Sequence, residues 1–148
     1  MGAPYTGGCA CGAIRYECLA EPLFSWKCHC RDCQRYSGAG GGIYAVFLTS
    51  SVRFLKGEPK YHVVKGASGN NTSRGFCPEC GSPTAVKTEL FPGICAASID
   101  DPTWVRLVAN IWTASAQPWD VMAQSSPKFV GTPTAEEVEK LVQAATGH

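Results

Sequence analysis

Hydrophobic and polar positions alternate along much of the chain in a way that predicts short β-strands. Residues 12–18 switch between apolar and polar side chains with the period of two that marks a half-buried strand. Residues 43–48 form a continuous apolar run of strand length, which a turn at residues 49–51 follows. Aromatic and β-branched residues, which favour a pleated sheet, dominate further segments at 52–55, 61–64, 93–98 and 105–112. We therefore expect a mainly β, antiparallel chain with little helix.

Near the C-terminus the apolar period changes from that of a strand to that of a helix. Thr134 and Glu137 form a capping box, in which each side chain satisfies a backbone amide of the other residue. One apolar face follows at the spacing i, i+3, i+4 and i+7, made by Val138, Leu141, Val142 and Ala145. We expect a helix at about 134–146 and a shorter one at 31–37. No repeat or long linker divides the sequence, so residues 1–148 are expected to form a single domain.

The bulk composition indicates a globular protein without a strongly charged surface. Of the 148 residues, 45% are hydrophobic and 17% are charged, and the formal net charge is +1. No run of lysine or arginine supplies the basic stripe that nucleic-acid binding requires, so we expect no nucleic-acid partner. No apolar run reaches the roughly 20 residues of a membrane helix, and no signal peptide opens the sequence. We therefore expect no membrane partner and a cytoplasmic location.

Cysteine spacing is the strongest chemical signal in the sequence. Seven of the nine cysteines lie in three short clusters, which are Cys9-x-Cys11, Cys28-x-Cys30-x-x-Cys33 and Cys77-x-x-Cys80. A disulfide framework is the alternative, but the odd count, the absence of a secretory signal and the strained rings that such close pairs would form argue against it. Zinc takes four ligands, so the clusters can divide into a set of four and a set of three. We therefore expect two zinc ions per chain.

The set of four is expected to form a closed, structural zinc site. Cys77-Pro-Glu-Cys80 has the form of a zinc knuckle, and Gly81 permits the tight turn that follows it. A knuckle supplies two ligands, and Cys9 and Cys11 are the obvious second pair because glycines surround them. Zinc bound there would contribute free energy of folding directly, since it would join the start of the chain to a distant hairpin.

The set of three is expected to hold a second zinc ion with one open position. Cys28, Cys30 and Cys33 lie within six residues, which suits ligation of a single ion. His29 lies between two ligands, and adjacent side chains of an extended segment point in opposite directions, so we do not expect it to bind the ion. Cys18 and Cys95 could supply a fourth ligand from a distance, although burial as small hydrophobic residues is the simpler interpretation.

A site with three thiolates and one open position favours chemistry on sulfur. Zinc held in this way binds a thiol and lowers its pKa, so the first interpretation is activation of a small thiol substrate as a nucleophile. Hydrolysis by a hydroxide bound to the ion is the second interpretation. The third is a closed structural site completed by an unidentified side chain.

The order of the three motifs resembles the glutathione-dependent formaldehyde-activating enzyme family, whose domain also occurs in centromere protein V. The resemblance runs from about residue 5 to residue 130. Its motifs are Gly7-Gly8-Cys9-x-Cys11-Gly12, Cys28-His29-Cys30-x-x-Cys33-Gln34 and Gly75-Phe76-Cys77-x-x-Cys80-Gly81-Ser82. A tail motif, Ile111-Trp112-Thr113-x-Ser115, matches in part.

The resemblance implies a β-tent fold with two zinc ions divided as above. It further implies a carbon–sulfur lyase that condenses glutathione and formaldehyde to S-hydroxymethylglutathione. Some members of the β-tent fold instead bind protein partners, so a non-enzymatic zinc module is the alternative function. The tail departs from the family at three places, all expected to face the substrate: Asn110 replaces a histidine, Ala116 replaces a lysine, and residues 123–127 replace an Asp-Gly-Leu-Pro stretch.

Three further features lie close to the three-cysteine cluster. Trp26 is expected to form a wall of a pocket. Arg31 and Arg35 flank the cluster and could attract an acidic thiol such as glutathione, although solvated arginines are the default. The glycine-rich residues 37–42 could present backbone amides to an anion, or could let strands approach closely.

Overall fold

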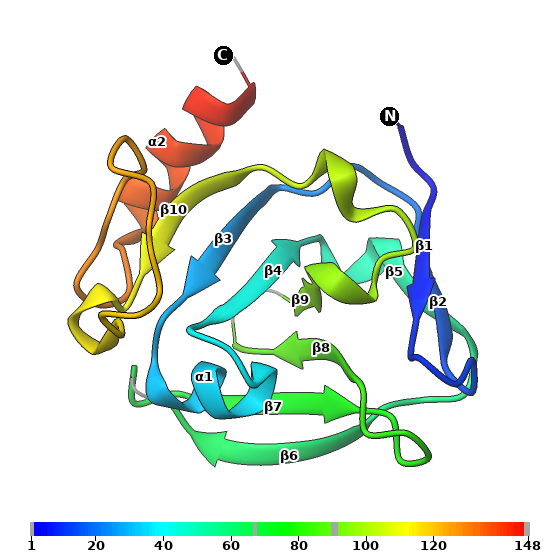
Figure 1. Ribbon diagram of the computed structural model, residues 1–148. Helices are drawn as coiled ribbons and strands as arrows, with labels where there is room; N and C mark the ends of the chain where they lie inside the picture. Colours follow the sequence, from blue (N-terminus) through cyan, green and yellow to red (C-terminus); the bar gives the residue numbers. More distant parts are fainter. Residues whose placement is uncertain (1, 67, 90–91, 147–148) are drawn as a thin grey trace.

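A seven-stranded sheet forms most of the molecule, and a three-stranded sheet packs beside it (Figure 1). The computed structural model describes residues 2–66, 68–89 and 92–146. The small sheet has the order β1 (Tyr5–Gly8), β2 (Arg15–Cys18), β5 (Val52–Lys56). The large sheet has the order β10 (Leu107–Ile111), β3 (Phe24–Cys28), β4 (Gly42–Val46), β9 (Pro92–Cys95), β8 (Pro83–Lys87), β7 (Asn71–Phe76), β6 (Lys60–Lys65). The mainly β fold expected from the sequence is confirmed.

One strand pair departs from the expected antiparallel arrangement. β10 runs parallel to β3, with Asn110 opposite Lys27 and Ile111 opposite Cys28, whereas the other neighbouring strands are antiparallel. A parallel pair needs a long crossover connection, and here the chain passes through six other strands before it returns beside β3. This pairing places β10 directly against the strand that ends at the three-cysteine cluster.

The segments with a strong apolar pattern form strands, as the sequence predicts, whereas several strands lie in segments with a weak pattern. The apolar run at 43–48 overlaps β4, the segment at 52–55 lies within β5, and 61–64 lies within β6. The segment at 93–98 is a strand only to Cys95, because a 3-10 turn at Ala96–Ser98 follows. The sequence pattern does not predict β1, β3, β7 and β8, because their short or polar segments carry little periodic signal.

The main hydrophobic core lies between the two sheets. Tyr16 of the small sheet, Ile94 of the large sheet and Phe47, which directly follows β4, are fully buried there. Full burial of an apolar side chain of this size contributes about 1.5–3 kcal/mol. Tyr5 packs against Trp104 with ring centroids 4.4 Å apart, which ties β1 to the 3-10 turn at Pro102–Trp104.

Both expected helices are present. α1 (Arg31–Ser37) begins directly after Cys30 and ends at Gly38, whose φ of 71° is left-handed. α2 (Ala135–Thr146) begins with the capping box: the Thr134 amide donates to Glu137 Oε2 over 2.7 Å, and the Glu137 amide donates to Thr134 Oγ1 over 3.2 Å. Neither helix, nor any other in the described ranges, has the length and apolar character to cross a membrane.

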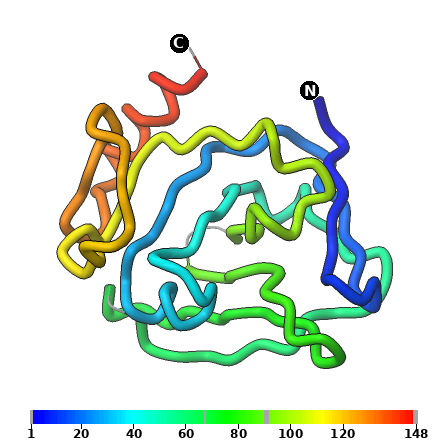
Figure 2. The backbone as a smooth tube through the Cα atoms, in the orientation of Figure 1, coloured from blue at the N-terminus to red at the C-terminus, as the bar shows by residue number. Residues whose placement is uncertain are grey.

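The segment after β10 folds back along that strand before α2 begins (Figure 2). Asn110 donates its amide to the Pro127 carbonyl over 2.8 Å, and its own carbonyl accepts from the Phe129 amide over 2.9 Å. Leu141 of α2 is partly buried against the apolar cluster that surrounds the cysteines at 28, 30 and 33. The C-terminal part of the chain therefore covers the β10 side of that cluster.

Candidate metal centres and the adjoining pocket

The four cysteines expected to form the closed site converge in space. The sulfur atoms of Cys9, Cys11, Cys77 and Cys80 all lie within 4.8 Å of one another. The turn between β1 and β2 carries the first pair and closes where the Cys9 amide donates to the Ile14 carbonyl over 3.2 Å. The second pair lies on the loop between β7 and β8, where Gly81 adopts a left-handed φ of 78°. This cluster can hold a metal ion.

Donors around the four-cysteine cluster suit thiolate ligands. The Ile14 amide donates to Cys9 Sγ over 3.2 Å. Ser82 Oγ accepts from the Ala10 amide over 3.1 Å, which leaves its hydroxyl proton for Cys80 Sγ, 3.1 Å away. This hydroxyl, together with backbone hydrogen bonds from Ser82 and Cys11, lowers the pKa of the Cys80 thiol to about 5. Ser82 therefore links the two loops and stabilises the form of Cys80 that binds metal.

The second cluster holds three cysteines at the junction of β3 and α1. Cys28 ends β3, Cys30 caps the N-terminus of α1, and Cys33 lies in its first turn. The Cys33 amide donates to Cys30 Sγ over 3.3 Å, so the helix start itself brings these two sulfurs together. No histidine, acidic or further cysteine side chain of the described residues joins this group within 4.8 Å. The cluster can hold a metal ion with three ligands from the chain.

The other candidate ligands lie elsewhere. His29 is fully buried, with Nε2 2.8 Å from Asn110 Oδ1 and Nδ1 3.4 Å from an Asp120 carboxylate oxygen. Cys18 is buried in the main core. Cys95 lies 3.4 Å from the Tyr36 hydroxyl and outside the three-sulfur group. These placements agree with the interpretation that these three side chains are not metal ligands.

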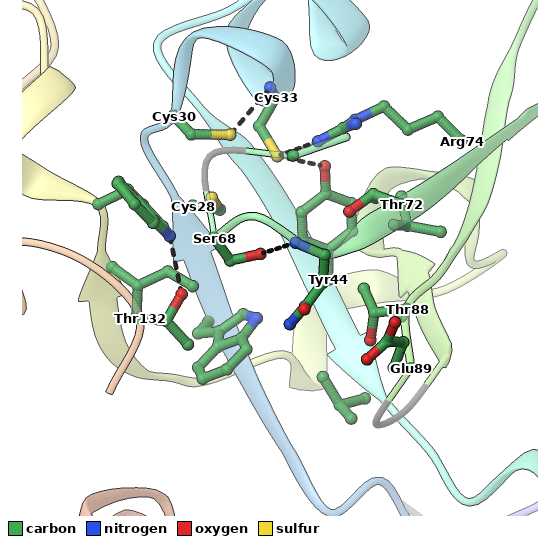
Figure 3. A pocket seen from close by; sticks show the side chains of 18 of the residues that line it. Cys28, Cys30, Cys33, Tyr44, Ser68, Thr72, Arg74, Thr88, Glu89 and Thr132 are labelled. Carbon is green, nitrogen blue, oxygen red and sulfur yellow. Dashed lines mark hydrogen bonds between the residues drawn. The ribbon is translucent and has the colours of Figure 1, made fainter. Parts of the chain in front are cut away.

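Two buried donors converge on Cys33 (Figure 3). The Tyr44 hydroxyl donates to Cys33 Sγ over 3.2 Å, and Arg74 Nη2 donates to the same sulfur over 3.6 Å. Contacts with Cys28 and Cys30, and then with Tyr44 and Arg74, hold the pKa of the Cys33 thiol far below its usual value. Burial raises the pKa of the Tyr44 phenol, so that group remains a donor. Cys33 therefore lies in surroundings that stabilise its thiolate.

A cavity of about 190 Å³ opens on the three-cysteine cluster. Its walls are mostly apolar and include Phe24, Trp26, Val86, Ile111, Trp112 and Val138. The prediction that Trp26 forms a pocket wall is confirmed. Polar side chains of Ser68, Thr72, Thr88 and Glu89 lie on the side of the pocket that faces β7 and β8 (Figure 3). The pocket therefore combines a sulfur-rich end with largely apolar walls.

The arginine that contacts the cluster is Arg74, which the sequence pattern does not indicate. Arg31 and Arg35 are exposed on α1 and are not among the residues that line the pocket. Arg74 lies on β7, retains only 8% exposure, and lines the pocket. Its place three residues before Cys77, in the strand that leads into the knuckle, was the only signal that could have indicated it.

The glycine-rich segment serves close packing. A Cβ atom on Gly40 would collide with the Asp120 side chain, and one on Gly41 would collide with the Cys28 carbonyl. Neither residue lines the pocket. The second interpretation of residues 37–42, close approach of the backbone, therefore accounts for these two glycines.

The tail departures lie away from the pocket. Asn110 is buried beside His29, and neither Ala116 nor residues 123–127 line the cavity. Ile111 and Trp112 line it instead. The expectation that the altered positions face a substrate is therefore not met in this pocket.

The fold and the side chains define a mainly β protein with two cysteine clusters that can each hold a metal ion, one of them beside a pocket. The sequence matches the family "Glutathione-dependent formaldehyde-activating enzyme" over residues 4–115, and the chain belongs to this family. The match ends before α2, so Val138 contributes to the pocket from outside the matched region.

Two relatives illustrate the similarity. A protein of Halomonas elongata, provisionally named a glutathione-dependent formaldehyde-activating enzyme, is 29% identical over 105 residues. The match covers 69% of this chain and 59% of that relative, so the chain spans less than two thirds of the relative's length. The crystal structure of a Rhodobacter sphaeroides protein aligns with a TM-score of 0.52 and 20% identity, covering 84% of this chain and 98% of that chain. That likeness concerns the fold.

Proposed function

We propose that the protein is a zinc-dependent enzyme of the carbon–sulfur lyase type that joins a small thiol to a carbonyl compound. Glutathione and formaldehyde, giving S-hydroxymethylglutathione, are the first candidate substrates. The observation that carries the proposal is a group of three cysteine sulfurs with no fourth ligand from the described residues, lying at the end of a pocket. Membership of the family supports the same reaction class.

Both clusters fit zinc in donor chemistry. Each offers only sulfur ligands, and each receives hydrogen bonds that stabilise thiolates, at Cys80 in the first and at Cys30 and Cys33 in the second. We assign Cys9, Cys11, Cys77 and Cys80 to a structural ion, and Cys28, Cys30 and Cys33 to an ion that retains an open position. The chemistry that zinc supplies at such a position is to bind a thiol and lower its pKa.

Residues around the open position would stabilise a negatively charged sulfur atom in the pocket. Three thiolates and one dication carry one net negative charge, and the buried guanidinium of Arg74 offsets it. Tyr44 and Arg74 fix the Cys33 sulfur from the same side. The apolar walls, including Trp26 and Ile111, exclude water and so strengthen electrostatic interactions at the reacting atoms.

The reaction balances without any redox partner. The thiol loses its proton to solvent, and its sulfur lone pair forms a bond to the carbonyl carbon. The π pair of the carbonyl bond moves to oxygen, which takes up a proton from water. The reverse reaction breaks the same carbon–sulfur bond.

Exchange spectroscopy tests this proposal directly. The exchange of glutathione with formaldehyde is measured with and without the zinc-loaded protein, because the uncatalysed reaction is itself fast. Isothermal titration reports thiol binding separately. We expect both binding and acceleration, and expect Cys30→Ser to lose both, whereas Cys18→Ala, in the main core, retains them.

The two measurements separate the alternatives. Binding without acceleration would indicate a thiol receptor that acts with another electrophile. If glutathione and other small thiols neither bind nor react, the enzyme proposal is wrong and the non-enzymatic zinc module becomes the better interpretation.

A further inference from the structure

Arg74 has more hydrogen-bonding capacity than its described neighbours use. Its side chain is 8% exposed, and Nη2 donates to Cys33 Sγ over 3.6 Å. Its Nε and Nη1 atoms are buried and have no hydrogen-bond partner among the described residues. A buried donor without a partner costs about 1–3 kcal/mol, so such a group in a pocket wall indicates that a ligand or water supplies the acceptor.

The surrounding side chains do not supply this acceptor. None of the ion pairs within the described ranges involves Arg74, although Glu89 lines the same pocket. The Tyr44 hydroxyl lies nearby but donates to Cys33. An arginine guanidinium is not deprotonated in proteins, so the side chain stays charged. The two free donors therefore belong to a permanent cation at the sulfur-rich end of the pocket.

We propose that Arg74 is a catalytic residue whose Nη1 donates to the carbonyl oxygen of the electrophile while Nη2 holds Cys33; this rests on the proposed function. The guanidinium already touches one sulfur of the cluster, and the carbonyl oxygen is separated from the attacking sulfur by a single carbon. Arg74 lines the same pocket as the three cysteines, so a carbonyl compound that reacts beside them would lie next to the guanidinium. As the carbon–sulfur bond forms, the π pair moves onto that oxygen, where the cation stabilises the developing charge before water protonates it.

Charge compensation alone is the competing role, and it makes a different prediction for lysine. A lysine retains the positive charge but presents a point charge on a flexible stem, without the fixed fork of donors. If Arg74 only balances the three thiolates, Arg74→Lys should work nearly as well as the parent protein. If the guanidinium holds Cys33 and the carbonyl oxygen at the same time, the lysine variant, which has a single nitrogen, should bind thiols normally and still react slowly.

The experiment compares Arg74→Lys, Arg74→Gln and the control Arg35→Gln. Arg35 is exposed on α1 and does not line the pocket. Zinc content, circular dichroism, the glutathione dissociation constant and the rate of glutathione–formaldehyde exchange are measured for each zinc-loaded protein. The absorption spectrum of the cobalt-substituted form reports whether the ligand sphere changes.

We expect Arg74→Lys to lower the catalysed rate on the order of 100-fold while the dissociation constant, metal content and cobalt spectrum stay unchanged. Arg35→Gln should match the parent protein. A lysine variant that retains the full rate, or one whose thiol binding falls as much as its rate, would overturn the role. If Arg74→Gln does not fold, the lysine variant still decides the question.

The exchange rates of the parent protein and its variants distinguish an error in the role of Arg74 from an error in the proposed function. In the first case the parent protein binds glutathione and accelerates exchange, and the arginine variants do so equally well. In the second case the parent protein itself does not accelerate exchange, and the role of Arg74 is rejected together with the reaction.

Discussion

His29 Nε2 donates to the side-chain oxygen of Asn110 over 2.8 Å, in the interior of the protein. The amide nitrogen of Asn110 donates to Ser126 Oγ over 2.8 Å, so its oxygen is the atom that accepts from the imidazole. His29 stands between Cys28 and Cys30, and Asn110 lies on β10, so this bond fixes the orientation of the segment that carries two of the three cysteines. Asn110, which departs from the family tail motif, thus has a defined structural partner.

Replacing Asn110 with alanine should destabilise the protein by about 1–3 kcal/mol, because the substitution leaves a buried imidazole without its acceptor. Urea denaturation measures the loss. Asn71→Ala is the control, since Asn71 is exposed on β7, and it should stay within about 0.5 kcal/mol of the parent. Equal losses in the two variants would show that the bond to His29 does not stabilise the fold.

Cys77→Ser should remove one of two zinc ions and unfold or aggregate the protein. The four-cysteine cluster joins the β1–β2 turn to a loop 66 residues later, so the metal contributes directly to folding. Metal analysis and thermal unfolding measure both effects. Cys18→Ala removes a buried thiol outside either cluster and should retain both ions. A folded Cys77→Ser protein of unchanged stability would disprove the assignment.

Cys30→Ser should release the second ion at a smaller cost in stability than Cys77→Ser. The three ligands of that ion lie within six residues, so their ion closes no long loop and restricts the unfolded chain little. Metal content and the free energy of unfolding in urea are compared for the two variants. A larger loss of stability in Cys30→Ser would reverse the assignment of structural and open sites.

Gly40→Ala should destabilise the protein by about 1–3 kcal/mol, because the new methyl group would overlap the Asp120 side chain. Asp120 also pairs with Lys27, whose Nζ lies 2.7 Å away, so the overlap would disturb the contact between β3 and the C-terminal segment. Thermal unfolding measures the effect. Gly131→Ala places its methyl group in ordinary contact with Trp112 and should be tolerated. Similar stability in both variants would argue against close packing at Gly40.

The local features of this protein follow from its sequence. The capping box at Thr134 and Glu137 acts within one turn, so its spacing sufficed to predict the start of α2. The apolar run at 43–48 predicted β4 for the same reason, since most of the strand lies inside the run. Cysteine spacing predicted the division into four and three, because two residues between thiols let both reach a single ion.

The tertiary structure decided which side chains meet across long separations in the sequence. Strand order placed β10 parallel to β3 and brought Asn110 to His29, and it turned Arg74 toward Cys33, 41 residues away. Arg31 and Arg35 are much closer to the cluster in the sequence, yet they lie on the exposed face of α1. Spacing along the chain determines only local geometry, whereas strand pairing and burial select the distant donors that reach a site, and for this reason the environment of Cys33 could not be predicted from the sequence.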